Sequence, residues 1–376
     1  MHFFYLGLTA LGAAAFFVGL GQDAGRAWHN YLLNYFFWFS LSISGLFFIA
    51  LSYVTTSQWA SPLKRVPEAL TGFLPVAFVL LLILFAGSHH LYEWTHHEAV
   101  AGDPLLSGKR GYLNMPFFVI RNLLFFVLWI GVAFYLIRNS LRQDRTGAVE
   151  LTFKNKKVSA PFLVLFGITF TLASFDLLMS LEPHWFSTIF GVYCFAGLFE
   201  SGMAITILFV LALRRQGALR GVINENHLHD LGKLMFAFCV FWAYIAFSQY
   251  MLIWYGNLPE ETPYMIRRTE GSWTPVALAL LFGKFIVPFF LLLSRWAKRN
   301  EFFLALVAVW VLVFQYLDIY WIVFPTVGAP AFGWMELGIL LGFLGLFVLS
   351  VTAVLQRIPP VARRDPWLEE GLSYHQ

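Results

Sequence analysis

The sequence predicts an all-α, polytopic membrane protein with about ten transmembrane helices. Of its 376 residues, 59% are hydrophobic and only 12% are charged, whereas soluble domains carry about 25% charged residues. The apolar residues form runs of roughly 20, the length of helix that crosses about 30 Å of hydrocarbon. Polar and turn-forming residues separate the runs. Lipid is therefore the expected solvent of most of the chain.

The apolar runs set the expected order of elements. The predicted spans are 3–20, 31–53, 67–90, 115–138, 158–180, 186–212, 230–254, 274–295, 302–322 and 333–355. The first span lacks the basic segment and the cleavage site of a signal peptide, so it is expected to remain as a helix. Residues 1–356 are expected to form one transmembrane domain. Spans two to five (about 31–180) and six to nine (about 186–322) would make two tandem four-helix bundles, with residues 357–376 as a tail.

The distribution of lysine and arginine predicts the orientation. The loops after the even-numbered spans, together with the tail, hold most of the 25 basic residues, namely Lys64, Arg65, Arg138, Arg142, Arg145, Lys154, Lys156, Lys157, Arg214, Arg215, Arg220, Arg295, Lys298, Arg299, Arg357, Arg363 and Arg364. Basic loops stay on the cytoplasmic side, so both termini are expected to be cytoplasmic. The net charge of +4 reflects this asymmetry and does not indicate nucleic-acid binding.

The chemistry of the side chains excludes several cofactors. The two cysteines, Cys194 and Cys239, are too few for an iron–sulfur cluster, and the chain has no C-x-x-C-H motif for covalent haem. No phosphate-binding glycine motif is present in a strand–helix setting. The chain is therefore expected to bind no metal or covalent cofactor of its own.

Charged residues inside the predicted spans are the main candidates for function, since each costs roughly 2.5–3.5 kcal/mol to insert. The set comprises Arg121, Asp176, Glu200, Asp230, Lys233, Lys284, Asp318 and Glu336. It extends from one face of the membrane to the other, and the favoured interpretation is a proton path or a polar binding cavity. The alternative is a set of buried ion pairs that hold helices in register, for example Glu200 with Lys284 or Arg121 with Asp176. Pro288 is expected to free the carbonyl of Lys284 from its helical partner.

Two further patterns accompany these charges. Asp176 and Asp318 lie late in spans five and nine, and Arg121 and Lys284 lie in spans four and eight, which suggests duplication of a four-helix unit. Six histidines fall on the predicted outer side, namely His29, His89, His90, His96, His97 and His184. Histidine changes charge near neutral pH, so such a cluster suits proton exchange or hydrogen bonding to a quinol. The alternative is that these are solvent-exposed loop histidines that contact a neighbouring subunit.

Two long stretches resemble a known family. One is FDLLMSLEPHWFST at 175–188, and the other runs from HDLGK at 229–233 through FSQY at 247–250 to WYGNLPEE at 254–261. They resemble the large membrane subunits of bacterial alternative complex III, a quinol:electron-acceptor oxidoreductase, within the polysulfide-reductase (NrfD-like) superfamily. The resemblance covers the whole ten-helix layout and is greater to the smaller, second of the two paralogous subunits.

The resemblance implies a subunit without redox centres in the bacterial cytoplasmic membrane. Its implied partners are the paralogous NrfD-like subunit, an iron–sulfur protein, multihaem and monohaem cytochrome c subunits that carry the haem c groups, and a terminal oxidase. Menaquinol is the implied ligand, with His89, His90, Asp176 and His184 as candidate quinone-binding residues. Asp230 and Lys233 would lie at the cytoplasmic mouth of the second bundle.

The resemblance and the buried charges together predict a function. Quinol oxidation would occur on a partner subunit, and this chain would act as a scaffold that also carries protons from Asp230 and Lys233, through Glu200 and Lys284, to Asp176, Asp318 and the outer histidines. A secondary transporter and a purely structural membrane anchor are the alternatives, because broken helices and midplane charges also suit a transporter.

Overall fold

The computed structural model describes residues 2–375, and this part of the chain consists of helices joined by turns and loops, with no strand. Ten helical segments are long and apolar enough to cross a membrane, which confirms the predicted fold class. They are α1 His2–Gln22, α2 Ala24–Thr55, α3 Arg65–Leu70 with η2 Thr71–Phe73 and α4 Leu74–Ala86, α8 Met115–Thr146, α9 Glu150–Leu177, α10 Phe190–Arg215, α11 Glu225–Gly256, α13 Thr274–Leu280 with η6 Leu281–Ile286 and α14 Val287–Leu293, α16 Glu301–Val323, and α17 Trp334–Leu355.

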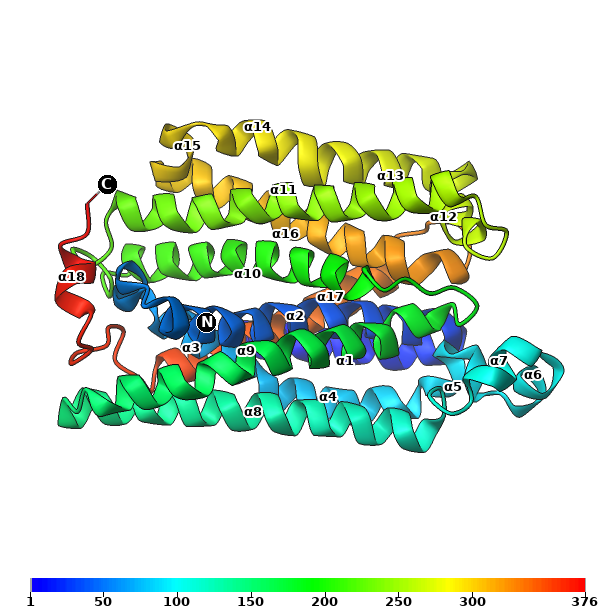
Figure 1. Ribbon diagram of the computed structural model, residues 1–376, viewed down its shortest axis with the longest axis horizontal. Helices are drawn as coiled ribbons and strands as arrows, with labels where there is room; N and C mark the ends of the chain where they lie inside the picture. Colours follow the sequence, from blue (N-terminus) through cyan, green and yellow to red (C-terminus); the bar gives the residue numbers. More distant parts are fainter. Residues whose placement is uncertain (1, 376) are drawn as a thin grey trace.

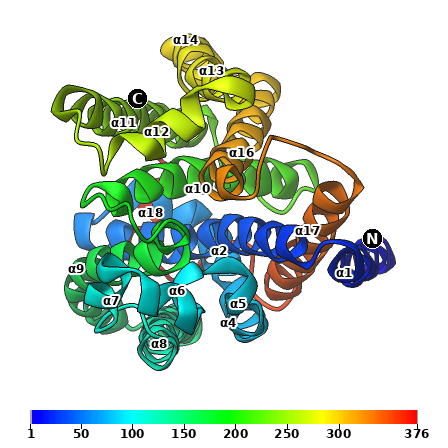
Figure 2. The same ribbon diagram turned by 90° about the vertical axis from the view of Figure 1, so that its right-hand side faces the viewer.

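The long helices group around α2, which is buried along most of its length. On one side α2, α4, α8 and α9 pack together as a first bundle; on the other side α10 packs against α11 and α16, and α13–α14 complete a second bundle. The two bundles meet where α10 and α16 contact α2 and α10 contacts α9. Figure 2, which looks along the helices, shows α2 and α10 between the two groups.

The first and last spans pair with each other outside both bundles. Their contact uses small residues: a Cβ atom on Gly12 would lie 2.2 Å from Gly342 Cα, and one on Gly338 would lie 2.6 Å from Ala15 Cβ. Small residues let two membrane helices approach closely, and dispersion then holds them together. Helices α1 and α17 lie together at one edge of the molecule in Figure 2.

Short helices and loops occupy the two ends of the molecule (Figure 1). One end, here called the basic end, comprises 56–64, 147–149, 216–224, 294–300 and 356–375, with η1 Gln58–Leu63, α15 Arg295–Arg299 and α18 Leu368–Leu372. The other, here called the histidine end, comprises 87–114, 178–189, 257–273 and 324–333. It contains α5 Ser88–Leu91, η3 Glu93–Thr95, α6 His97–Gly102, α7 Pro104–Lys109, η4 Met179–Leu181, α12 Thr262–Thr269, η5 Gly271–Trp273 and η7 Phe324–Thr326.

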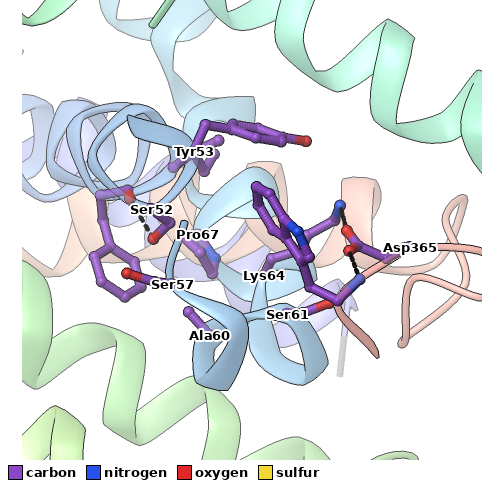
Figure 3. Close-up of a pocket in the computed structure, with 11 residues that line it drawn as sticks. Ser52, Tyr53, Ser57, Ala60, Ser61, Lys64, Pro67 and Asp365 are labelled. Carbon is purple, nitrogen blue, oxygen red and sulfur yellow. Dashed lines mark hydrogen bonds and ion pairs between the residues drawn. The ribbon is translucent and has the colours of Figure 1, made fainter. Parts of the chain in front are cut away.

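The C-terminal tail packs against the other segments of the basic end. Asp365 pairs with Lys64 and accepts a hydrogen bond from the backbone nitrogen of Trp367 (2.9 Å), and both contacts are visible in Figure 3. The carbonyl of Gly371 lies 3.0 Å from His227 Nε2 at the start of α11. The tail therefore joins the loop after α2 in the first bundle to α11 in the second.

The docking of α18 gives a testable prediction. A Cβ atom on Gly371 would lie 2.6 Å from Pro62 Cδ and 2.7 Å from the carbonyl oxygen of Gln58. Because a backbone oxygen and a proline ring cannot rotate away, Gly371→Val should release the tail, at a cost of roughly 1–3 kcal/mol. Trypsin should then cleave after Arg363 and Arg364 roughly tenfold faster than in the wild type. Leu372→Ala, at the neighbouring exposed position, is the control; equal cleavage rates in the two variants would contradict the prediction.

Candidate functional site

A charged cluster lies inside the second bundle, where α10, η6 and α16 meet. Lys284 Nζ donates to Asp318 Oδ2 (2.5 Å) and to Gln315 Oε1 (2.5 Å), and the hydroxyl of Tyr193 donates to the other oxygen of Asp318. Lys284 and Asp318 are each only 1% exposed. The ring of Trp242 covers the ammonium, with its centroid 4.3 Å from Nζ. The buried charges are thus balanced and hydrogen-bonded, the condition under which an ion pair is tolerated in a low-dielectric interior.

The backbone around Lys284 departs from the α-helix. Residues Leu281–Ile286 form a π-helical turn between α13 and α14, a feature that is frequent at functional sites. Pro288 has no N–H group, so the carbonyl of Lys284 lacks its α-helical donor, as predicted; Cys239 Sγ lies 3.5 Å from that oxygen. The missing side chain of Gly197 leaves room for Gln315, because a Cβ there would lie 2.5 Å from Gln315 Oε1.

Glu200 lies in the same bundle and differs from its neighbours. Its side chain is fully buried on α10, and neither carboxyl oxygen has a hydrogen-bond partner among residues 2–375. The suggested pairing of Glu200 with Lys284 is wrong, because Lys284 donates to Asp318 and Gln315 instead. Glu200 still interacts electrostatically with Lys284 and Asp318. Buried polar groups are nearly always hydrogen-bonded, so Glu200 is an exception that calls for a reason.

Asp230 and Lys233 lie where α11 begins, at the basic end. They form an ion pair three residues apart along the helix. Asp230 is buried, whereas the side chain of Lys233 is 44% exposed. Five of the eight predicted intramembrane charges, namely Glu200, Asp230, Lys233, Lys284 and Asp318, therefore belong to the second bundle.

The first bundle has one buried ion pair of similar design. Arg121 on α8 forms a two-pronged contact with Asp176 on α9, with Nη2 to Oδ1 at 2.8 Å and Nε to Oδ2 at 3.1 Å, and Asn122 also donates to Asp176 (3.1 Å). The structural pairing of Arg121 with Asp176 is thus observed. In each bundle a base on the third helix binds an acid on the fourth, the layout that the sequence suggested as a duplication.

Glu336 lies apart from both bundles. It accepts hydrogen bonds from Arg26 Nε (2.8 Å) and Asn30 Nδ2 (2.9 Å) on α2, and its other oxygen accepts one from the Gly333 nitrogen (2.7 Å) at the start of α17. These contacts attach α17 to α2 and cap the helix. The eight predicted residues therefore do not form one line, and only the second-bundle group brings several of them together.

The histidine end has an open hollow of about 690 Å³. His29, His89, His90, His96 and His184 line it, together with Arg267 and Glu182. Three of the four candidate quinone-binding residues thus lie around one hollow, whereas Asp176 is not among its lining residues. His184 Nε2 lies 2.5 Å from Asp103 Oδ2, and this hydrogen bond lowers the pKa of Asp103 from its usual value.

Two buried arginines are absent from the predicted set of functional residues, because both lie outside the predicted spans. Arg65 is fully buried at the basic end and pairs with Glu68 and Asp144. Arg268 is 1% exposed at the histidine end; it pairs with Glu182 and donates to the carbonyl of Ile322 (2.8 Å). The sequence did contain an indication that Arg65 could be buried: Glu68, three residues later, lies inside the predicted third span and can pair with it. Nothing near Arg268 in the sequence indicates Glu182, which lies 86 positions away.

The fold and this buried, paired charge distribution define the class: an α-helical, multi-pass membrane protein with ionisable groups inside its bundles. A scan against protein-family models gives no match, and a search of curated proteins finds no relative.

Proposed function

We propose that the chain is a cofactor-free membrane subunit of a bacterial quinol:electron-acceptor oxidoreductase of the alternative complex III type, and that its second bundle carries protons. The observation that supports proton transfer is Glu200, a fully buried carboxyl group with no hydrogen-bond partner among residues 2–375. A carboxyl group of this kind can gain or lose a proton without breaking an existing hydrogen bond, and it interacts electrostatically with Lys284 and Asp318.

The order of groups along the bundle suits a relay. Asp230 and Lys233 stand at the basic end, where a proton would enter. Glu200 and Lys284 follow in the interior. Tyr193, about 10 Å from Glu200 along α10 by helical rise, binds Asp318 near the histidine end. Ionisable chains of this type mark proton pathways in membrane proteins.

The hollow at the histidine end supports the other half of the proposal. Its imidazoles can donate hydrogen bonds to a quinol oxygen or accept them from a quinol hydroxyl. Quinol oxidation releases two protons on that side, while partner subunits with haem c and iron–sulfur clusters accept the electrons. The chain would provide scaffold and proton groups, and the partners would provide electron transfer.

The test is the number of protons released per electron, measured with the assembled complex in sealed vesicles. Glu200→Gln should lower this ratio while electron transfer continues, because the amide has the same shape but cannot carry the proton. Glu336→Gln is the matched control: it changes an equally buried acid that lies outside both bundles, so the ratio should stay at the wild-type value. A wild-type ratio in the Glu200 variant would refute proton transfer through this residue.

A secondary transporter is the second candidate, favoured by the two interrupted spans at Thr71–Phe73 and Leu281–Ile286. Purification under mild conditions separates the two functions. A subunit of the proposed complex should be recovered with haem-bearing partners, whereas a transporter should be recovered alone. Recovery as a colourless single chain would count against the proposed complex.

A further inference from the structure

A second open hollow, of about 640 Å³, lies at the basic end of the first bundle. Glu68, Thr71 and Gly72 of the third span, α8 and Val354 of α17 form its walls. Helix α8 lies at the periphery of the molecule in Figure 2, so the hollow faces the surroundings of the protein.

One wall of this hollow is basic. Arg138, Arg142 and Arg145 follow each other at intervals of four and three residues, which places them on one face of α8. All three are exposed. Among residues 2–375, no carboxylate lies within ion-pair distance of any of these three guanidinium groups.

The nearby acids are already engaged. Glu68 binds the buried Arg65, and Asp144 binds Arg65 and the backbone nitrogen of Arg363. Two carboxylates therefore face four guanidinium groups, and positive charge remains in excess around the hollow. The excess sits on the exposed arginines of α8, where an anion from outside can reach it.

Apolar side chains line the same hollow. On α8, Phe134 lies one turn before Arg138, and Ile137 and Leu141 lie beside the arginines; Val354 on α17 completes the apolar lining. From Phe134 to Arg145 the helix rises about 16 Å, so apolar and basic side chains share one wall of the hollow. A ligand with an anionic head and hydrocarbon chains matches both parts.

We propose that this groove binds an anionic phospholipid. Its phosphate would contact Arg138, Arg142 and Arg145, and an acyl chain would lie over Phe134, Ile137 and Leu141. Basic pockets between membrane helices bind anionic headgroups, with about 1 kcal/mol from each basic residue near the surface. The site uses none of the groups assigned to proton transfer, so it stands independently of the proposed function.

The test compares phosphatidylglycerol with phosphatidylcholine of the same acyl chains, added to the delipidated full-length protein in detergent. The wild type should be stabilised in thermal unfolding by phosphatidylglycerol, and it should retain that lipid in native mass spectrometry. The variant R138Q/R142Q/R145Q should bind it about 100-fold more weakly. Its unfolding temperature without lipid should equal that of the wild type, because the three side chains are exposed and unpaired.

The control is K154Q/K157Q/R220Q, which removes the same charge from exposed positions outside the groove, two in the first turns of α9 and one in the basic end. It should bind phosphatidylglycerol as the wild type does. Equal loss in both triple variants would overturn the proposal, because general surface charge would then account for binding. So would equal stabilisation of the wild type by phosphatidylcholine, or full stabilisation by inorganic phosphate alone.

Discussion

Replacing Asp318 with leucine should lower the free energy of unfolding by about 3–5 kcal/mol, because it leaves the ammonium of Lys284 buried without its counter-charge. Lys284 is 1% exposed, and its other acceptor, Gln315, is neutral. The hydroxyl of Tyr193 would also lose its acceptor. Few single substitutions have effects of this size, and those that do usually leave an unpaired buried charge.

Adding Lys284→Met to Asp318→Leu distinguishes two quantities: the net contribution of the ion pair to the free energy of unfolding, and the loss caused by leaving one charge buried without its partner. The double variant Lys284→Met/Asp318→Leu removes both charges of the ion pair, so much of the lost stability should return. Reversible unfolding of the wild type, Asp318→Leu, Lys284→Met and the double variant in one detergent measures the coupling. Glu301→Gln, which breaks the partly exposed pair with Arg214 at the start of the same helix, should cost no more than about 1 kcal/mol. If the double variant were as unstable as the less stable of the two single variants, the expected coupling between Lys284 and Asp318 would be contradicted.

Replacing Gly12 with alanine should separate α1 from α17. The added Cβ would lie 2.2 Å from Gly342 Cα and 2.8 Å from Gly342 N. Because both are backbone atoms, no side-chain rotation can relieve the overlap, and the helices must move apart. Dispersion between closely packed backbones provides much of the attraction between membrane helices. We expect a loss of roughly 1–3 kcal/mol and faster hydrogen exchange along α1.

Gly7 provides the matched control on the same helix. A Cβ atom there would meet nothing within 4 Å, so Gly7→Ala should leave both stability and exchange unchanged or slightly improve helix stability. The reciprocal change Gly342→Ala should reproduce the Gly12 effect, since its Cβ would lie 2.5 Å from Gly12 Cα. Similar behaviour of the Gly7 and Gly12 variants would show that the close approach does not hold α1 in place.

The pattern of the sequence predicted the helices more accurately than the partners of their charges. Arg121 and Asp176 were recognised as buried and were suggested as a pair, and they do bind each other. Lys284 was suggested as a partner of Glu200 and binds Asp318 instead. Depth along a helix follows from residue number, but the direction in which a side chain points relative to another helix depends on how the two helices rotate and cross.

The ends of the spans were harder to interpret. Arg65 lies outside the predicted spans and is nevertheless fully buried, because Glu68, Ser140 and Asp144 bind its guanidinium group. The tail itself was predicted only as a segment outside the membrane. Its docking depends on Lys64 and on the missing side chain of Gly371, which are contacts between distant parts of the chain.

The sequence by itself determined that this is a ten-helix membrane protein with charges inside its spans. Backbone polar groups in lipid must be bonded within helices or between the strands of a closed barrel, and continuous apolar runs of roughly 20 residues have the length of a membrane helix and not of a barrel strand. Only the tertiary structure decided which charges neutralise each other and which do not. Lys284 and Asp318 became a closed pair, whereas Glu200 has no hydrogen-bond partner in the described part of the chain. That outcome depends on the packing of α10 against α16, which local sequence does not encode.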